Sequence, residues 1–313
     1  MFLTWILLAV GLAMIVFGAD FLVDGASAIA RRSGISEFVI GLTIVGFGTS
    51  CPELVVSITG AISGNSDISI GNVIGSNIFN SMFILGLTAV LSPVAISAEN
   101  RRRDIPIVIA VSLLLALSGM FVGKEGGISR IEGAAFLVIF AVYMYYCFKN
   151  GRSDAETETR ISMSTPKALV YILLGLGGLV YGGDIFVDSA TDIARASGVS
   201  DKVIAITLLA GGTSLPELAT CIVAVVKKRG EMALGNILGS NIFNILLILG
   251  CSAVISPLSF EHISYTDMGV LILSQLLIFT SAYTDKKDSI DRIDGVIMLV
   301  CEAAYLVILF IAG

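Results

Sequence analysis

The sequence predicts an all-α membrane protein whose ten transmembrane helices form two inverted repeats of five helices. The first observation is composition: 14% of the 313 residues are charged and 56% are hydrophobic, whereas a soluble domain carries about 25% charged residues. The second is the placement of charge, since residues 2–19, 68–98, 105–123 and 232–260 contain none. The third is a pair of motifs that recurs at a constant spacing. A soluble globular enzyme is therefore excluded.

Ten apolar segments follow one another along the chain, each close to the roughly 20 residues that a helix needs to cross a bilayer. They cover residues 2–30, 36–62, 69–92, 104–122, 130–149, 167–194, 200–227, 233–257, 264–283 and 292–311. The third and eighth lie wholly in uncharged stretches, and the fourth is uncharged after Asp104. The first carries Asp20 and Asp24 near its end, and Glu53 and Glu217 interrupt the second and the seventh. A polar linker near the midpoint divides the chain into residues 1–150, 151–166 and 167–313.

The basic residues predict the orientation of these helices. Fifteen of the 19 Lys and Arg residues fall in or beside the loops that follow odd-numbered segments. Loops rich in Lys and Arg remain in the cytoplasm. We therefore expect a multi-pass protein of the plasma membrane with a cytoplasmic linker and both termini outside.

The two halves of the chain repeat each other. Residues 48–58 match residues 212–222, and residues 71–80 match residues 235–244, both at an offset of 164. The same offset relates the pair Asp20 and Asp24 to Asp184 and Asp188. Because each unit has five helices, an odd number, the second unit enters the membrane the other way up. In transporters with such inverted repeats, the substrate site lies near the midplane where the repeats meet.

Two glutamates inside apolar segments are the first candidate site residues. Glu53 and its repeat mate Glu217 lie where a charge costs at least about 2.5–3.5 kcal/mol. No Lys or Arg lies within an apolar segment to pair with them, so a cation from solution is the natural partner. The alternative is a protonated, hydrogen-bonded glutamate in the core.

Prolines and hydroxyl residues surround both glutamates. Pro52 and Pro216 each remove a helix hydrogen bond, which frees a backbone carbonyl. The adjoining hydroxyl residues are Thr49, Ser50, Thr213 and Ser214. Clusters of hard oxygen ligands suit Ca²⁺ or Na⁺ rather than zinc or copper. A simple proline kink is the alternative, but it does not explain the acid and the hydroxyls.

A second polar set lies on the third and eighth segments. Ser76 and Asn80 are four residues apart and share a helix face, as do Ser240 and Asn244. These faces would complete a cation cage. Four further asparagines are expected to cap or brace helices instead: Asn72, Asn77, Asn236 and Asn241.

Three remaining features are weaker candidates for the site. We interpret Asp20, Asp24, Asp184 and Asp188 as solvated acids near the membrane interface, Glu302 as a lone acid without an acidic repeat mate, and His262 as a loop residue.

The motifs Gly-Thr-Ser-x-Pro-Glu and Gly-Ser-Asn-Ile-Phe-Asn, each present twice, resemble the two alpha-repeats of the sodium/calcium exchanger branch of the cation/calcium antiporter superfamily. The resemblance places these repeats at residues 41–87 and 205–251. It implies antiport of Na⁺ against Ca²⁺ by alternating access, with the first and sixth helices sliding across the other eight.

The resemblance also implies a set of ligands. They are Thr49, Ser50, Glu53, Ser76, Asn80, Thr213, Ser214, Glu217 and Ser240, with the carbonyls of Gly46 and Ala210. Asn244 belongs to the same set, but many members carry Asp at this position. The number of coupled ions therefore stays open.

The expected function is thus a Na⁺/Ca²⁺ antiporter with Ca²⁺, Na⁺ and the lipid bilayer as partners, no cofactor and no nucleic acid. A H⁺/Ca²⁺ antiporter is the alternative within transport, and a cation channel is the alternative outside it. An intramembrane enzyme is disfavoured because the sequence lacks His-Glu-x-x-His and has one histidine. The sequence does not indicate an oligomeric state.

Overall fold

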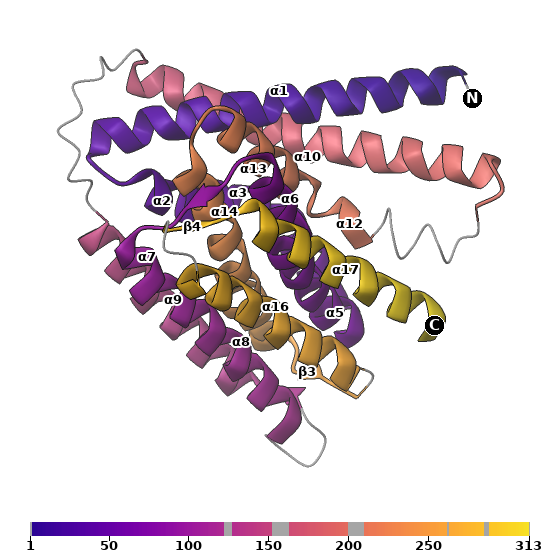
Figure 1. The fold of residues 1–313 in the computed structure, drawn as a ribbon. Helices are drawn as coiled ribbons and strands as arrows, with labels where there is room; N and C mark the ends of the chain where they lie inside the picture. Colours follow the sequence, from indigo (N-terminus) through magenta and orange to yellow (C-terminus); the bar gives the residue numbers. More distant parts are fainter. Residues whose placement is uncertain are drawn as a thin grey trace.

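The computed structural model describes residues 2–121, 127–151, 163–199, 210–261, 263–284 and 288–312 (Figure 1). His262 and most of the linker therefore lie outside the described residues. The first half contains α1 (Phe2–Ser33), α2 (Glu37–Ile40), η1 (Gly41–Val45), α3 (Gly46–Thr49), α4 (Cys51–Ile62), α5 (Ser66–Phe79), η2 (Asn80–Ile84), α6 (Leu85–Leu91), β1 (Val94–Ala95), α7 (Ala98–Arg102), α8 (Asp104–Phe121), β2 (Gly127–Ile128) and α9 (Arg130–Asn150).

The second half begins at α10, which is as long as α1. Its elements are α10 (Thr165–Ala196), α12 (Ala210–Gly212), α13 (Leu215–Val226), α14 (Gly230–Ile242), η4 (Phe243–Leu249), α15 (Gly250–Ile255), β3 (Leu258–Ser259), α16 (Tyr265–Thr284), β4 (Ser289–Ile290) and α17 (Arg292–Ala312).

The helices confirm an all-α membrane protein. Among the described residues, seven helices are long and apolar enough to cross a membrane, or eight if the bent pair Glu37–Thr49 and Cys51–Ile62 counts as one span. The other two predicted spans correspond to α8 and to the segment that ends in α13, a shorter apolar helix. The number of ten spans therefore stays a prediction.

Helices α1 and α10 lie side by side along the top of Figure 1, across the other helices. Glycines let the two backbones approach. A Cβ atom on Gly11 would come within 2.9 Å of the Gly182 carbonyl oxygen, and one on Gly18 within 2.9 Å of the Gly175 carbonyl oxygen. Since Gly11 and Gly18 are 164 residues before Gly175 and Gly182, the two contacts are the same pair taken in opposite order.

Two short ladders join the halves near the helix ends. Strand β1 pairs with β4 through Val94 and Ile290, and β2 pairs with β3 through Ile128 and Leu258. Each ladder joins two loops that the charge count places on the same side of the membrane. The pairing therefore agrees with the predicted alternation of the loops, while the identity of the cytoplasmic side stays a prediction.

Breaks in the helices create the centre of the molecule. The chain bends by 49° between α2–α3 and α4, and the residue at the break, Ser50, has φ −83° and ψ 9°. Its repeat mate Ser214, before α13, has φ −91° and ψ 8°. Each break precedes a proline, which cannot donate the helix hydrogen bond at its own position. The predicted kinks are thus present in both halves.

Candidate cation-binding site

Two fully buried carboxylates lie directly after the helix breaks. Glu53 is in the first turn of α4 and Glu217 is in the first turn of α13, and neither side chain is exposed. A helix N-terminus favours negative charge, so each break presents its glutamate where a carboxylate is tolerated best.

Each carboxylate is held by a serine from the other half of the chain. Ser50 Oγ donates to Glu217 Oε1 at 3.0 Å, and Ser214 Oγ donates to Glu53 Oε1 at 3.1 Å. The two bonds are repeat mates in opposite order. Both predicted alpha-repeats therefore meet at this pair of glutamates, and neither half forms the site alone.

Unpaired oxygen atoms mark the same residues. Of the fifteen buried side-chain N and O atoms without a hydrogen-bond partner in the described residues, six belong to predicted ligands. They are Glu53 Oε2, Glu217 Oε2, Ser76 Oγ, Asn80 Oδ1, Asn244 Oδ1 and Thr213 Oγ1. Buried polar groups normally have a partner, and the ion pairs of the described residues do not involve either glutamate. A cation is the partner that would satisfy such a set of oxygens.

The neighbouring predicted ligands lie against the two glutamates. Ser240 Oγ is 3.4 Å from Glu217 Oε1. Gly46 packs on the same part of α14, since a Cβ atom there would be 3.3 Å from the Ser240 nitrogen. Thr49 Oγ1 is 3.1 Å from the Val45 carbonyl oxygen. A hydroxyl that donates to the backbone keeps its lone pairs for a cation.

The other ligands predicted from the second half are placed less directly. Thr213 lies beside Glu53. Ala210 opens α12, but its side chain is outside the described part. Asn244 follows Ser240 by one helical turn, at the start of the π-helical segment η4. The role of each predicted residue as a ligand stays a prediction.

An amide network between the halves orients Asn80 and Asn244. Asn80 Nδ2 donates to Asn241 Oδ1 at 3.3 Å, and Asn244 Nδ2 donates to Asn77 Oδ1 at 2.9 Å. Asn77 Nδ2 in turn donates to the Asn241 carbonyl oxygen at 3.1 Å. The bracing role expected for Asn77 and Asn241 is therefore confirmed. Because Asn80 and Asn244 use their N–H groups on the other half, their oxygens remain free.

The other two asparagines brace the helices that carry the glutamates. Asn72 Nδ2 donates to Ser57 Oγ at 3.0 Å, and Asn236 Nδ2 lies 3.3 Å from Cys221 Sγ. These contacts are again repeat mates, with a thiol replacing a hydroxyl.

Two polar residues of this network were not predicted. Ser81 accepts hydrogen bonds from Asn241 Nδ2 at 2.8 Å and from Gln275 Nε2 at 2.9 Å. Gln275 lies within an otherwise apolar segment and is 1% exposed. An amide in the middle of a membrane helix was the available signal, but neither residue has a polar mate at the repeat offset.

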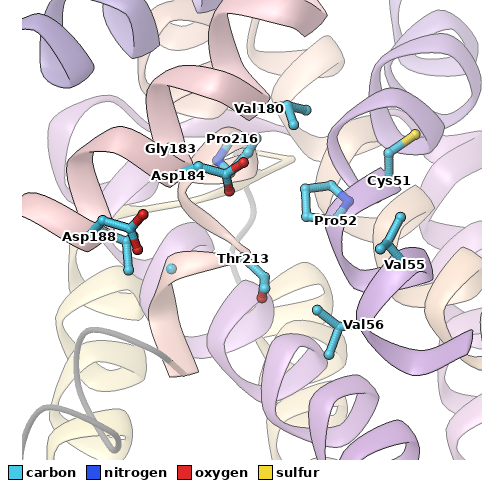
Figure 2. Close-up of a pocket in the computed structure, with 12 residues that line it drawn as sticks. Cys51, Pro52, Val55, Val56, Val180, Gly183, Asp184, Asp188, Thr213 and Pro216 are labelled. Carbon is cyan, nitrogen blue, oxygen red and sulfur yellow. The ribbon is translucent and has the colours of Figure 1, made fainter. Parts of the chain in front are cut away.

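A cavity of about 380 Å³ is lined by Pro52 and Pro216, the residues directly before the two glutamates. Figure 2 shows the residues around it. Pro52 and Val56 of α4 line one side, Asp184 and Asp188 of α10 line the other, and Thr213 lies between them. Asp184 and Asp188 are exposed, as predicted, but they line this cavity rather than an open interface.

Asp20 and Asp24, the repeat mates of these aspartates, form ion pairs instead of lining a cavity. Asp20 Oδ1 and Asp24 Oδ1 each lie 2.7 Å from Lys227 Nζ, at the end of α13. The side chains of Asp20 and Asp24 are 43% and 45% exposed, as expected for solvated acids, but the ion pairs with Lys227 were not predicted. Lys227, whose side chain is 26% exposed, thus links both carboxylates of α1 to the end of α13.

The site can hold cations with a total charge of about two. The described residues contain no group of three His, Cys, Asp or Glu that could bind a metal, so the charge comes from two carboxylates and the remaining donors are neutral oxygens. Hard oxygen donors of this kind suit Ca²⁺ and Na⁺.

Comparisons with known proteins indicate the family of the chain. A family model described as sodium/calcium exchanger protein matches residues 3–149 and 167–311. The chain is 39% identical to the putative antiporter CaxA of Alkalimonas amylolytica, over 99% of both chains. It is 34% identical to the sodium/calcium exchanger MaX1 of Methanosarcina acetivorans, over 98% of both. A solved structure of the sodium-calcium exchanger NCX_Mj, soaked without Na⁺ and Ca²⁺, covers 98% of this chain and 99% of its own, with TM-score 0.85 and 34% identity.

The fold and the site thus define a multi-pass membrane antiporter of the cation/Ca²⁺ class, and not an enzyme. Both matched segments span nearly a whole half of the chain. The chain belongs to the sodium/calcium exchanger family.

Proposed function

We propose that this protein exchanges Na⁺ for Ca²⁺ across the plasma membrane by alternating access. The observation that carries the proposal is the pair of buried glutamates, each bound by a serine of the other half and each with one unpaired carboxylate oxygen. A buried carboxylate without a partner is costly, and a site that alternately binds two kinds of cation removes that cost. The similarity to MaX1 and NCX_Mj, which are both sodium/calcium exchangers, supports these two ions.

The proposed site comprises twelve groups. They are the side chains of Thr49, Ser50, Glu53, Ser76, Asn80, Thr213, Ser214, Glu217, Ser240 and Asn244, and the carbonyls of Gly46 and Ala210. Two carboxylates neutralise one Ca²⁺ or two Na⁺, and a third Na⁺ would make the occupied site positive. Because Asn244 donates its N–H to Asn77, it adds an oxygen to the site but no charge.

The proposed architecture is ten spans in two inverted repeats, with both termini outside and the linker in the cytoplasm. Contacts between residues at the same offset in opposite order support the inversion: Gly11 with Gly182, Gly18 with Gly175, and the two serine–glutamate bonds. The cavity beside Asp184 is then an outer route to the glutamates. The Lys227 ion pairs lie on the opposite side, where the route is closed.

The test is Ca²⁺ uptake into proteoliposomes that contain the purified protein. Uptake driven by an outward Na⁺ gradient at equal pH, and lost when Na⁺ is equal on both sides, is the expected result. Uptake that follows a pH gradient without Na⁺ would establish the H⁺/Ca²⁺ antiporter. Uptake that ignores both counter-ion gradients would establish a channel. The hydroxyl-rich surroundings of the glutamates favour Na⁺. Hydroxyl oxygens serve as ligands for Na⁺, but hydroxyl groups neither take up nor release a proton at neutral pH and so do not help to transport H⁺.

A further inference from the structure

Gln275 of α16 is a buried polar residue that does not belong to the proposed ligands. Only 1% of it is exposed. Its Nε2 donates to Ser81 Oγ at 2.9 Å and lies 3.1 Å from Ser274 Oγ, and its Oε1 has no partner. Burial of an incompletely bonded amide costs free energy, so the residue is retained at a cost that another role would explain.

Two further hydrogen bonds lead from Ser81 to a proposed ligand. Ser81 Oγ also accepts from Asn241 Nδ2 at 2.8 Å, and Asn241 Oδ1 accepts from Asn80 Nδ2 at 3.3 Å. A hydroxyl oxygen has two acceptor positions, and the two N–H donors fill both. Donation therefore converges on Ser81 from both ends, directly from Gln275 and, through Asn241, from Asn80, whose Oδ1 has no partner.

This series exists in one half only. At the repeat offset, Ser81 corresponds to Ile245, and Gln275 corresponds to Val111 at an offset of 164 or to Leu113 at an offset of 162. None of these side chains can donate or accept a hydrogen bond. Asn244, the mate of Asn80, is held by Asn77 alone. Gln275 therefore acts on one side of an otherwise duplicated arrangement.

We propose that Gln275 is a positioning residue for the cation site. By donating to Ser81, it holds the amides of Asn241 and Asn80 in the orientation that presents Asn80 Oδ1 to the cation. The proposal rests on the proposed function, because it takes Asn80 as a ligand.

Loss of the Gln275 donor has a specific consequence. Ser81 Oγ is then held by one N–H donor instead of two and is no longer fixed where it accepts from Asn241. Ser81 can turn and donate its own proton to Asn241 Oδ1, and the amides of Asn241 and Asn80 can both reverse. Asn80 would direct an N–H group toward the cation instead of an oxygen. Since the reversed series is still hydrogen-bonded, the fold is kept while the affinity for cations falls.

The test is Gln275→Leu in the full-length protein, with two readouts. One is the Ca²⁺ concentration that gives half-maximal exchange in proteoliposomes. The other is the rise in Tm that Ca²⁺ produces in detergent, which reports binding to the folded state. We expect half-saturation at about fivefold higher Ca²⁺, the equivalent of one hydrogen bond, with an unchanged maximal rate and a smaller rise in Tm.

Ser81→Ala removes the same connection at its other end. It should weaken Ca²⁺ binding to the same extent, and the double variant should be no weaker than either single variant, because residues of one hydrogen-bond network are not additive. The matched control is Ser112→Ala in α8, which removes a buried hydroxyl without a hydrogen bond to the series. It should leave half-saturation unchanged.

The outcomes separate the two proposals. If Gln275→Leu and Ser81→Ala lower Tm but leave half-saturation and the Ca²⁺-dependent rise in Tm unchanged, Gln275 is a structural residue and the inference is wrong. If Gln275→Leu does not fold, Ser81→Ala alone decides. If the wild-type protein shows neither Na⁺-driven uptake nor a Ca²⁺-dependent rise in Tm, the proposed function itself is wrong.

Discussion

At the scale of residues, the sequence predicted the centre of the site because the residues that indicate it are neighbours in the sequence. An acid inside an apolar segment stands out against its neighbours, and Glu53 and Glu217 stand out twice at one offset. The structure adds that each acid is bound by a serine of the other half. Sequence spacing does not contain that exchange, because it depends on how the halves are packed.

The first prediction concerns Glu53→Gln and Glu217→Gln. Each removes half of the charge that faces Ca²⁺ while keeping the shape of the side chain. Removal of one partner from a buried charge pair costs about 3–5 kcal/mol, so we expect Ca²⁺ exchange to fall by at least about 100-fold. The measurement is initial Ca²⁺ uptake under a Na⁺ gradient. In the absence of ions, Tm should not fall, because an unpaired buried carboxylate is replaced by a neutral amide.

Glu302→Gln is the matched control for these two variants. Glu302 is 3% exposed and its Oε2 also lacks a partner, but no hydrogen bond in the described part of the chain links it to a proposed ligand. Its exchange rate should stay within about twofold of the wild type, the size of a change away from the site. Near-normal Ca²⁺ uptake by Glu53→Gln would instead remove Glu53 from the site.

Gln275 illustrates what residue patterns leave out. Its role follows from a hydrogen bond to Ser81, a residue 194 positions away in the sequence. Neither residue belongs to a duplicated motif, so the repeat pattern indicates neither of them.

At the scale of elements, helix breaks were predictable and their detailed geometry was not. Proline and glycine indicate breaks directly before α4 and α13, and both breaks are present at Ser50 and Ser214. The π-helical segments η1, η2 and η4 have no comparable sequence signal, although such segments often occur at functional sites. Segment η2 begins at Asn80, and η4 contains Asn244, so two of the three π-helical segments contain a proposed ligand.

The contact between α1 and α13 also escaped prediction. Lys227 at the end of α13 binds Asp20 and Asp24 of α1, whereas the position that corresponds to Lys227 in the first half is Ser63. The aspartates of α10 therefore have no equivalent lysine and line a cavity instead. One lysine thus makes the two ends of a duplicated fold unequal.

The second prediction is that Lys227 stabilises the closed form of the side on which it lies. Lys227→Gln removes both ion pairs with α1. Partly exposed pairs contribute about 0.2–1 kcal/mol each, so the loss of two pairs costs up to about 2 kcal/mol, and the open form of that side should become up to about 30-fold more populated. The measurement is the rate of thiol labelling at Ala219→Cys, the repeat mate of the cavity residue Val55, after the five native cysteines are replaced by alanine.

Lys228→Gln is the control for this effect. It makes the same change of charge at the next residue, which is exposed and has a positive φ of 60° that Gln adopts as readily as Lys. Labelling should be unchanged in Lys228→Gln. An equal increase in both variants would mean that net charge, and not the contact with α1, sets the rate.

At the scale of the whole molecule, duplication explains why so much of the arrangement could be predicted. The five helices predicted for each unit would require inversion, and inversion would bring Glu53 and Glu217 together at the centre. The contacts that depart from the duplication are those that the sequence could not reveal, namely the Lys227 ion pairs and the bond from Gln275 to Ser81.

The third prediction tests the inversion itself. Ser33 ends α1 and Ser197 follows α10, both are exposed, and they are 164 residues apart. If the repeats are inverted, these two residues lie on opposite sides of the membrane, with Ser33 in the cytoplasm. Ser33→Cys and Ser197→Cys, each in the protein without native cysteines, should therefore react differently with a membrane-impermeant thiol reagent added to intact cells.

We expect Ser197→Cys to be labelled in intact cells and Ser33→Cys only after the membrane is opened. Labelling of both after opening is the control for reactivity, because both positions are exposed at the end of a long helix. Labelling of both in intact cells would place α1 and α10 in the same orientation and would refute the inverted repeat. The reverse pattern would keep the inversion but exchange the two sides, so that the positive loops would lie outside, against the rule from which the orientation was predicted.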